Sequence, residues 1–110
     1  MGELEIRHYV TVLGRDPFGE WLAKLRDRRA TAIVLLRIGR VQRGLFGDCR
    51  SLGAGVWELR IDVGPGYRVY FGRAGQKIVL LLCGGDKGHQ HEDIALARKY
   101  WSDYTAQPRT

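Results

Sequence analysis

The stretch WELRIDVGPGYRVYF, residues 57–71, decides the fold of this chain of 110 residues. Apolar and polar residues alternate on both sides of Gly64-Pro65-Gly66, a pattern that predicts two strands joined by a tight turn. Alternate side chains of a strand point to opposite faces of its sheet, so the polar residues of both strands share one face. We expect this face to stay open to solvent. The residues expected on it are Glu58, Arg60, Arg68 and Tyr70.

Composition predicts one globular domain over residues 1–106, followed by a frayed tail at 107–110. Hydrophobic residues make up 45% of the chain and charged residues 27%, near the averages for globular proteins. Two cysteines are too few for a disulfide framework and predict reduced thiols in a cytoplasmic protein. No apolar run is long enough to span a bilayer and no leader pattern opens the chain. We therefore expect a soluble protein without a membrane partner.

Positive charge is concentrated in one segment. The net charge is +6, and residues 24–50 hold eight lysines and arginines against two acids, Asp27 and Asp48. The net charge of this segment alone equals that of the whole chain. A local basic excess favours a polyanionic partner.

Hydrophobic spacing predicts two helices between a first strand at residues 3–12 and the stretch quoted above. Asp16 is a suitable N-cap and Pro17 suits the first helical position. The second helix is expected over residues 30–43. The apolar stripe of the first helix comprises Phe18, Trp21, Leu22 and Leu25, and that of the second comprises Val34, Ile38, Val41 and Leu45.

Glycine-rich turns divide the rest of the chain into strands at residues 49–52, 56–63, 67–73 and 77–83. The last of these, KIVLLLC, is continuously apolar, as in a central strand that is covered on both faces. A loop at 84–88 then leads to a final helix at 90–104. The predicted fold class is α+β: an N-terminal strand, a helical hairpin, an antiparallel sheet of three to four further strands and a C-terminal helix, with the helices packed on one sheet face.

Two motifs, ELRIDVGPGYRVYF at residues 58–71 and GGDKGxQxxDIxxA at 84–97, resemble the RelE/ParE superfamily of toxins from type II toxin-antitoxin systems. The likeness is greatest to the HigB-like "addiction module killer" branch and covers nearly the whole chain. The resemblance implies a compact RelE-like α+β domain and a cognate helix-turn-helix antitoxin that neutralises it. Many members are ribosome-dependent mRNA endonucleases that inhibit translation, whereas the ParE side poisons DNA gyrase.

The resemblance also implies roles for single residues. Arg68 matches the arginine that RelE-type toxins place against the scissile phosphate, Arg60 stands on the neighbouring strand, and Lys87 matches a further basic position. The sequence departs from the family where some relatives carry a tyrosine, since Asp93 stands about there with His91 nearby.

RNA cleavage by the 2′-hydroxyl needs cations against the phosphate as well as a base and an acid. Glu58 is the candidate base, although it is equally explained as the cross-strand partner of Arg60 or Arg68. His91 is the candidate acid. Tyr70 either stacks on a base or packs in the protein.

Further residues are candidates for RNA binding, namely Arg37, Arg40, Arg43, Arg50 and Tyr70. The positive helical surface is either solvated or binds ribosomal RNA or the acidic part of an antitoxin. His89 and His91 lack the additional ligands of a zinc site, so no metal or other cofactor is expected. Cys83 ends an apolar strand and is expected to be inert.

The sequence thus leads to a metal-independent mRNA endoribonuclease toxin, with mRNA, the ribosome and an antitoxin as partners. Two alternatives remain: a ParE-like toxin acting on DNA gyrase, and an inactive member that only binds RNA or its antitoxin.

Overall fold

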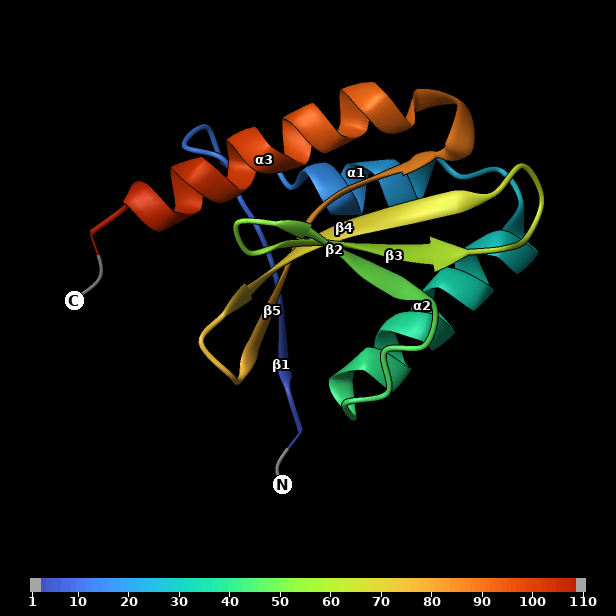
Figure 1. Ribbon diagram of the computed structural model, residues 1–110. Helices are drawn as coiled ribbons and strands as arrows, with labels where there is room; N and C mark the ends of the chain where they lie inside the picture. The colour runs from blue at the N-terminus through green and yellow to red at the C-terminus, as the bar shows by residue number, and fades with distance from the viewer. Residues whose placement is uncertain (1–2, 109–110) are drawn as a thin grey trace.

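The computed structural model describes residues 3–108 and consists of a five-stranded sheet with helices on both of its faces (Figure 1). The α+β class predicted from the sequence is confirmed. The strands are β1 (Glu5–His8), β2 (Cys49–Gly53), β3 (Val56–Ile61), β4 (Tyr67–Ala74) and β5 (Ile78–Asp86). The helices are α1 (Pro17–Lys24), α2 (Arg28–Gln42) and α3 (Gln90–Ala106), with a short 3-10 turn, η1 (Lys87–His89), before α3.

The sheet is mixed, with the strand order β1-β5-β4-β3-β2. Strands β2 to β5 form the expected antiparallel meander, and β1, whose pairing the sequence did not predict, pairs in parallel with β5. Alternation along a strand does not reveal the direction of its neighbour, and β1 meets β5 only after the two helices and three further strands have intervened in the chain. β1 is also shorter than the expected 3–12.

Both N-terminal helices begin after an aspartate N-cap, which was predicted at Asp16 but not at Asp27. Asp16 accepts a hydrogen bond from the Gly19 amide at 3.0 Å, and Asp27 accepts from the Arg29 amide at 2.9 Å. The cap at Asp27 starts α2 two residues before the expected position. The stripe of α2 is buried as predicted except at Leu45, which is 58% exposed because the helix has already ended before Gly44, whose φ is +83°.

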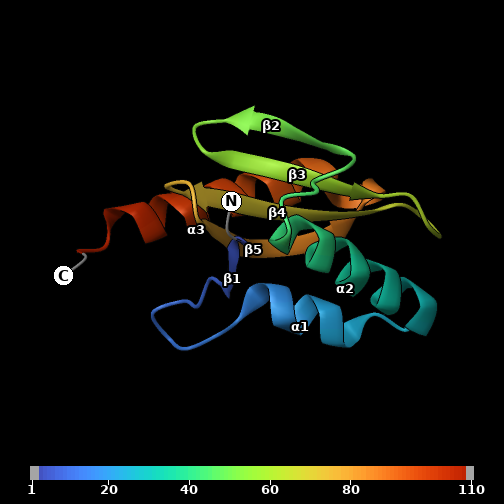
Figure 2. The same ribbon diagram turned by 90° about the horizontal axis from the view of Figure 1, so that it is seen from below.

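Both faces of the sheet are covered. Helices α1 and α2, which run side by side in Figure 2, pack on one face over a core that includes Phe18, Val34 and Phe71. Helix α3 packs on the other face, over a core that includes Leu82 and Ala97. The expectation of helices on one face only, with the other face open, was therefore wrong. An apolar strand such as β5 needs cover on both sides, and α3 provides the second.

The end of β5 differs from the expected loop at 84–88, because the strand continues through Gly84 and Gly85 to Asp86. A Cβ at Gly84 would overlap the Trp21 indole, and one at Gly85 would overlap the Asp93 carboxylate. These glycines therefore allow α1 and α3 to cross the strand closely from opposite sides. Helix α3 accordingly begins at Gln90 as expected, and it continues to Ala106.

The cysteines, the length of the helices and the C-terminal end bear on the remaining predictions from composition. Both cysteines are free thiols, Cys49 half-buried and Cys83 buried. Along residues 3–108, none of the helices has the length and apolarity needed to cross a membrane. After α3 ends, Gln107 is extended, and the rest of the predicted tail at 109–110 lies outside the described residues.

Candidate functional site

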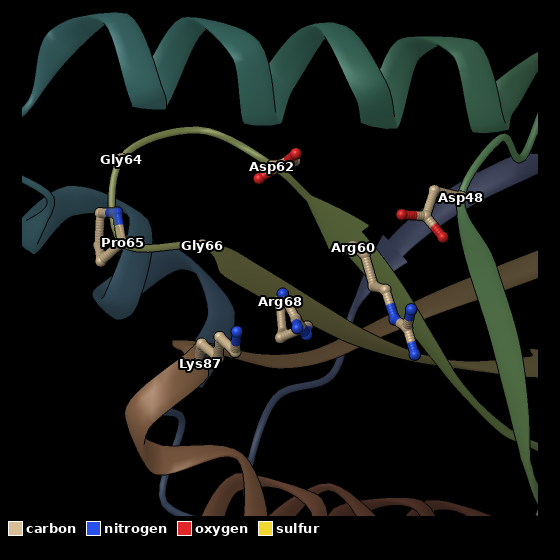
Figure 3. A pocket seen from close by; sticks show the side chains of 8 residues that line it. All are labelled: Asp48, Arg60, Asp62, Gly64, Pro65, Gly66, Arg68 and Lys87. Atoms are coloured by element: carbon tan, nitrogen blue, oxygen red, sulfur yellow. The ribbon is translucent and has the colours of Figure 1, made fainter.

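Strand register brings three cations to one end of the sheet. Arg60 on β3 lies directly opposite Arg68 on β4, and Lys87 follows the end of β5 next to them. Figure 3 shows these side chains around one opening. The opening is a cleft of about 360 Å³. Its lining consists of Asp48, Arg60, Asp62, Gly64, Pro65, Gly66, Arg68 and Lys87.

The β3–β4 turn holds Lys87 in place. The Gly66 amide donates to the Val63 carbonyl at 3.0 Å, and the Lys87 amide donates to the Gly66 carbonyl at 2.8 Å. Gly66 has a φ of +87°, a left-handed conformation that favours glycine. The turn predicted from Gly64-Pro65-Gly66 thus sets the position of the third cation.

Glu58 lies behind the arginines and is wholly buried. Its Oε1 accepts from Arg50 Nε at 2.9 Å and from Arg60 Nε at 3.4 Å, while Oε2 lies 3.9 Å from Arg68 Nε. Gln90 Nε2 donates to Oε2 at 2.7 Å. Burial by itself raises the pKa of the Glu58 carboxyl, but the hydrogen bonds from Gln90 and Arg50 outweigh it and leave the pKa below its usual range.

An ionised, buried carboxylate with both oxygens engaged orients the arginines. The geometry therefore favours the cross-strand interpretation of Glu58, and it adds Gln90, which sequence reasoning missed. Gln90 is a fixed position of the motif GGDKGxQxxDIxxA, but the sequence assigned it no role, because the contact forms only when α3 crosses the sheet.

Arg68 is the most enclosed of the three cations. Its side chain is 12% exposed, and among residues 3–108 its Nε has no hydrogen-bond partner. Arg60 is more open, with a side chain that is 38% exposed, and Lys87 is exposed. This Nε faces the buried Glu58 carboxylate, whereas the guanidinium as a whole lines the cleft and carries the positive charge that suits an anionic ligand.

Tyr70 and His91 do not reach this cleft. Tyr70 faces Glu58 across β3 and β4 and is wholly buried under α3, so the hypothesis that it stacks on an RNA base was wrong. Burial raises the pKa of its hydroxyl. His91 is exposed on the first turn of α3 and is absent from the cleft lining.

The predicted RNA-binding arginines fall into two groups. Arg37 is half-buried and ties α2 to the sheet, since it donates to the carbonyls of Arg60 at 2.6 Å and Phe46 at 3.3 Å. Arg40 is exposed on α2, and Arg43 is exposed at the C-cap of that helix. Arg50 is half-exposed and holds Glu58.

Two acids complete the cleft, and sequence reasoning did not assign either of them to a site. Asp62 follows Arg60 by two positions, so strand alternation was the available signal for it. Asp48 had no such signal, because it reaches the cleft only through tertiary pairing, in which its carbonyl accepts from the Arg60 amide at 2.9 Å.

Other reactive groups lie apart from the cleft. His89 Nδ1 is 2.9 Å from Asp86 Oδ1, an ion pair that raises the pKa of the histidine. Within the described part of the chain, no three His, Cys, Asp or Glu side chains gather as a metal site would require. Burial raises the pKa of the Cys83 thiol to about 12, as expected for an inert cysteine.

Comparison with known proteins shows that the chain is similar in sequence to a bacterial protein. No family model matches it. An uncharacterized protein of Haemophilus influenzae is 51% identical over 81 residues, which cover 74% of this chain and 82% of that protein.

Proposed function

We propose that this chain, which belongs to the same family as the uncharacterized Haemophilus influenzae protein, is the RelE-like toxin of a type II toxin-antitoxin system and cleaves mRNA on the ribosome. The observation that carries the proposal is the cross-strand pair of Arg60 and Arg68 beside Lys87, in a cleft of about 360 Å³. The cognate antitoxin and the cytoplasm as the site of action are parts of the same proposal.

The chemistry is an in-line attack of the 2′-oxygen on the adjacent phosphorus. The bond from phosphorus to the 5′-oxygen breaks, and the products are a 2′,3′-cyclic phosphate and a free 5′-hydroxyl. Arg60 and Arg68 neutralise the charge that grows on the non-bridging oxygens. Such preorganised cations commonly supply the largest single contribution to catalysis.

Proton transfer makes use of the groups that border the cleft. The 2′-hydroxyl releases its proton to water, and the Lys87 ammonium supplies one to the departing 5′-oxygen. Glu58 acts as a positioning residue, since its carboxylate is buried behind the guanidinium groups. The ribosome orients the RNA, which reduces the demand on acid and base groups that contribute about 10² to 10⁴-fold.

The test is primer extension on cellular transcripts after brief induction of the protein, with a translation-blocked message as a reference. We expect new 5′ ends in translated messages only. Arg60→Ala and Arg68→Ala should abolish them. Lys99→Ala is the charge-matched control, because it removes a positive charge from an exposed position on α3 outside the cleft lining, and it should leave cleavage intact.

Folding of each variant is checked by thermal unfolding, since Arg68 is largely enclosed. Arg60 is the more exposed of the pair, so its variant keeps the test valid if Arg68→Ala unfolds. Growth arrest without new ends would reject the nuclease and point to DNA gyrase as the target. Equal cleavage by folded Arg60→Ala would reject the assignment of the cation pair.

A further inference from the structure

The cleft has walls of opposite charge. Arg60, Arg68 and Lys87 line one side, and Asp48 and Asp62 line the other, as Figure 3 shows with both carboxylates above the cations. Although five charges share one cleft, neither aspartate forms a side-chain ion pair or hydrogen bond with another residue between 3 and 108. The arginines are directed to Glu58 instead. The two acids therefore keep their full capacity to accept hydrogen bonds.

The opposite charges of the two sides restrict which ligands the cleft can bind. The cation side accepts one phosphate, whereas the carboxylates repel a second phosphate placed across from it. A group on the acidic side must therefore carry N–H or O–H donors and no negative charge. In RNA, the base edges and the ribose 2′-hydroxyl carry such donors next to a phosphate, and the base edge is the one that differs between nucleotides. The volume of about 360 Å³ is in the range of sites for small ligands.

The four bases differ in what they offer to a carboxylate. Guanine presents two adjacent donors, N1–H and N2–H, which match the two oxygens of one carboxylate. Adenine and cytosine present one amino donor beside a ring-nitrogen acceptor. Uracil presents a single N–H between two carbonyl oxygens, which a carboxylate repels.

Asp62 is the better placed of the two acids. It follows directly after the end of β3 and lines the cleft beside Arg60, while Ile61 between them is buried in the core. It is exposed, and its neighbour along the chain is the turn that holds Lys87. Asp48 comes from a different segment of the chain, directly before β2.

We propose that Asp62 accepts the N1–H and N2–H donors of guanine, so that the cleft selects a guanylate in single-stranded RNA. The inference rests on the proposed function for its choice of RNA as the ligand. It assigns Asp62 as a specificity-determining residue and separates it from the cations, which bind any phosphate.

The test measures dissociation constants by NMR titration of the purified protein with GMP, AMP, CMP and UMP, and with inorganic phosphate as the reference. GMP should bind about tenfold or more tightly than UMP, the scale of discrimination by a bidentate contact. Asp62→Asn should lose this preference and yet bind inorganic phosphate more tightly, because one repelling charge is gone. Asp48→Asn is the charge-matched control, and it should tighten phosphate binding while keeping the preference.

In Asp62→Asn the preference for GMP should be lost while the affinity for inorganic phosphate rises. A merely structural effect is thereby excluded, because it would weaken the binding of GMP and of phosphate alike. Equal affinity of the wild type for the four nucleotides would overturn the inference, as would a preference that survives Asp62→Asn. A second titration compares a six-nucleotide RNA that contains one guanine with the same RNA lacking it, and with GTP. Tighter binding of GTP than of the guanine-containing RNA would overturn the assignment of RNA as the ligand.

The outcomes for the two proposals are separate. Cleavage in cells without guanine selection in these titrations rejects the inference and leaves the proposed function standing. Selective binding of the guanine-containing RNA without cleavage supports the inference and rejects the nuclease.

Discussion

At the scale of single residues, Glu58 determines the geometry of the site although it does not line the cleft. Its buried carboxylate is shared by Arg50 and Arg60 on one oxygen and by Gln90 on the other. Removing one partner of a buried charged network is costly because the remaining groups lose their compensation. The same residue that pattern analysis suggested as a base therefore has a clear role in positioning.

Glu58→Gln should lower the free energy of unfolding by about 2 kcal/mol, the range for hydrogen bonds between charged groups. The amide keeps one acceptor, but its NH₂ group meets donors from Arg50, Arg60 or Gln90. Urea unfolding measures the change. Glu92→Gln on the surface of α3 is the control and should change stability by less than about 0.5 kcal/mol. Equal effects of the two substitutions would contradict the role of Glu58.

The difference in stability between the wild type and Glu58→Gln should change with pH in a defined direction. The pKa of Glu58 is lower in the folded protein than its ordinary value of 4.5, so the unfolded state binds more protons between the two values. The stabilisation by ionised Glu58 is thus fully present above pH 4.5 and is lost as the pH falls through the folded pKa. The gap between the wild type and Glu58→Gln should narrow on acidification below pH 4.5. A gap that widens there would be inconsistent with the depressed pKa.

At the scale of elements, glycines set how closely helices approach the sheet. Trp101 of α3 lies directly over Gly72 of β4, and Trp21 of α1 lies over Gly84 of β5. A β-carbon at either glycine would overlap the indole ring above it. On both faces of the sheet, the helix therefore packs through the same kind of contact, in which an indole ring lies against a glycine of a strand.

Gly72→Ala should destabilise the protein by about 1–3 kcal/mol, as expected for overpacking in a core. Gly39→Ala is the matched control, because Gly39 lies within α2 with open space at its Cβ position. Alanine there should be neutral or stabilising by up to about 1 kcal/mol, from helix propensity. Thermal unfolding measures both.

A double variant tests the cause. Trp101→Leu should offset part of the effect of Gly72→Ala, so that the two changes are not additive. Full additivity would show that the loss does not come from the contact between the ring and the strand.

At the scale of the whole molecule, the first and last parts of the chain are joined across the sheet. Tyr9 follows β1, and its hydroxyl donates to the Asp103 carboxylate on α3, while its ring stacks on Tyr100 at a centroid distance of 4.9 Å. Burial and this hydrogen bond raise the pKa of Tyr9 to about 12. The contact links the strand that α1 and α2 follow to the helix on the opposite face.

Tyr9→Phe should cost about 1 kcal/mol at neutral pH, the typical contribution of one hydrogen bond. Since the folded pKa is raised above the ordinary value of 10.0, the stabilisation is fully present below pH 10 and is lost as the pH rises through about 12. The difference from the wild type should therefore disappear in that window. Tyr67→Phe on β4 is the control, and an equal loss there would contradict the specific role of Tyr9.

The sequence by itself determined the elements and the cations of the site. The cap at Asp16 and the alternation around Gly64-Pro65-Gly66 depend on neighbours close along the chain, so local patterns reveal them. The same alternation placed Arg60 and Arg68 on one face, where the register sets them opposite each other. These features needed no knowledge of distant contacts.

Only the tertiary structure decided what lies over that face and what completes the cleft. The direction of β1, the docking of α3, the contact from Gln90 to Glu58 and the position of Asp48 all depend on residues far apart in sequence. Periodicity shows which side of an element is apolar but not which other element covers it. The burial of Tyr70 and Glu58 follows from that packing choice, because α3 covers the face on which alternation places them.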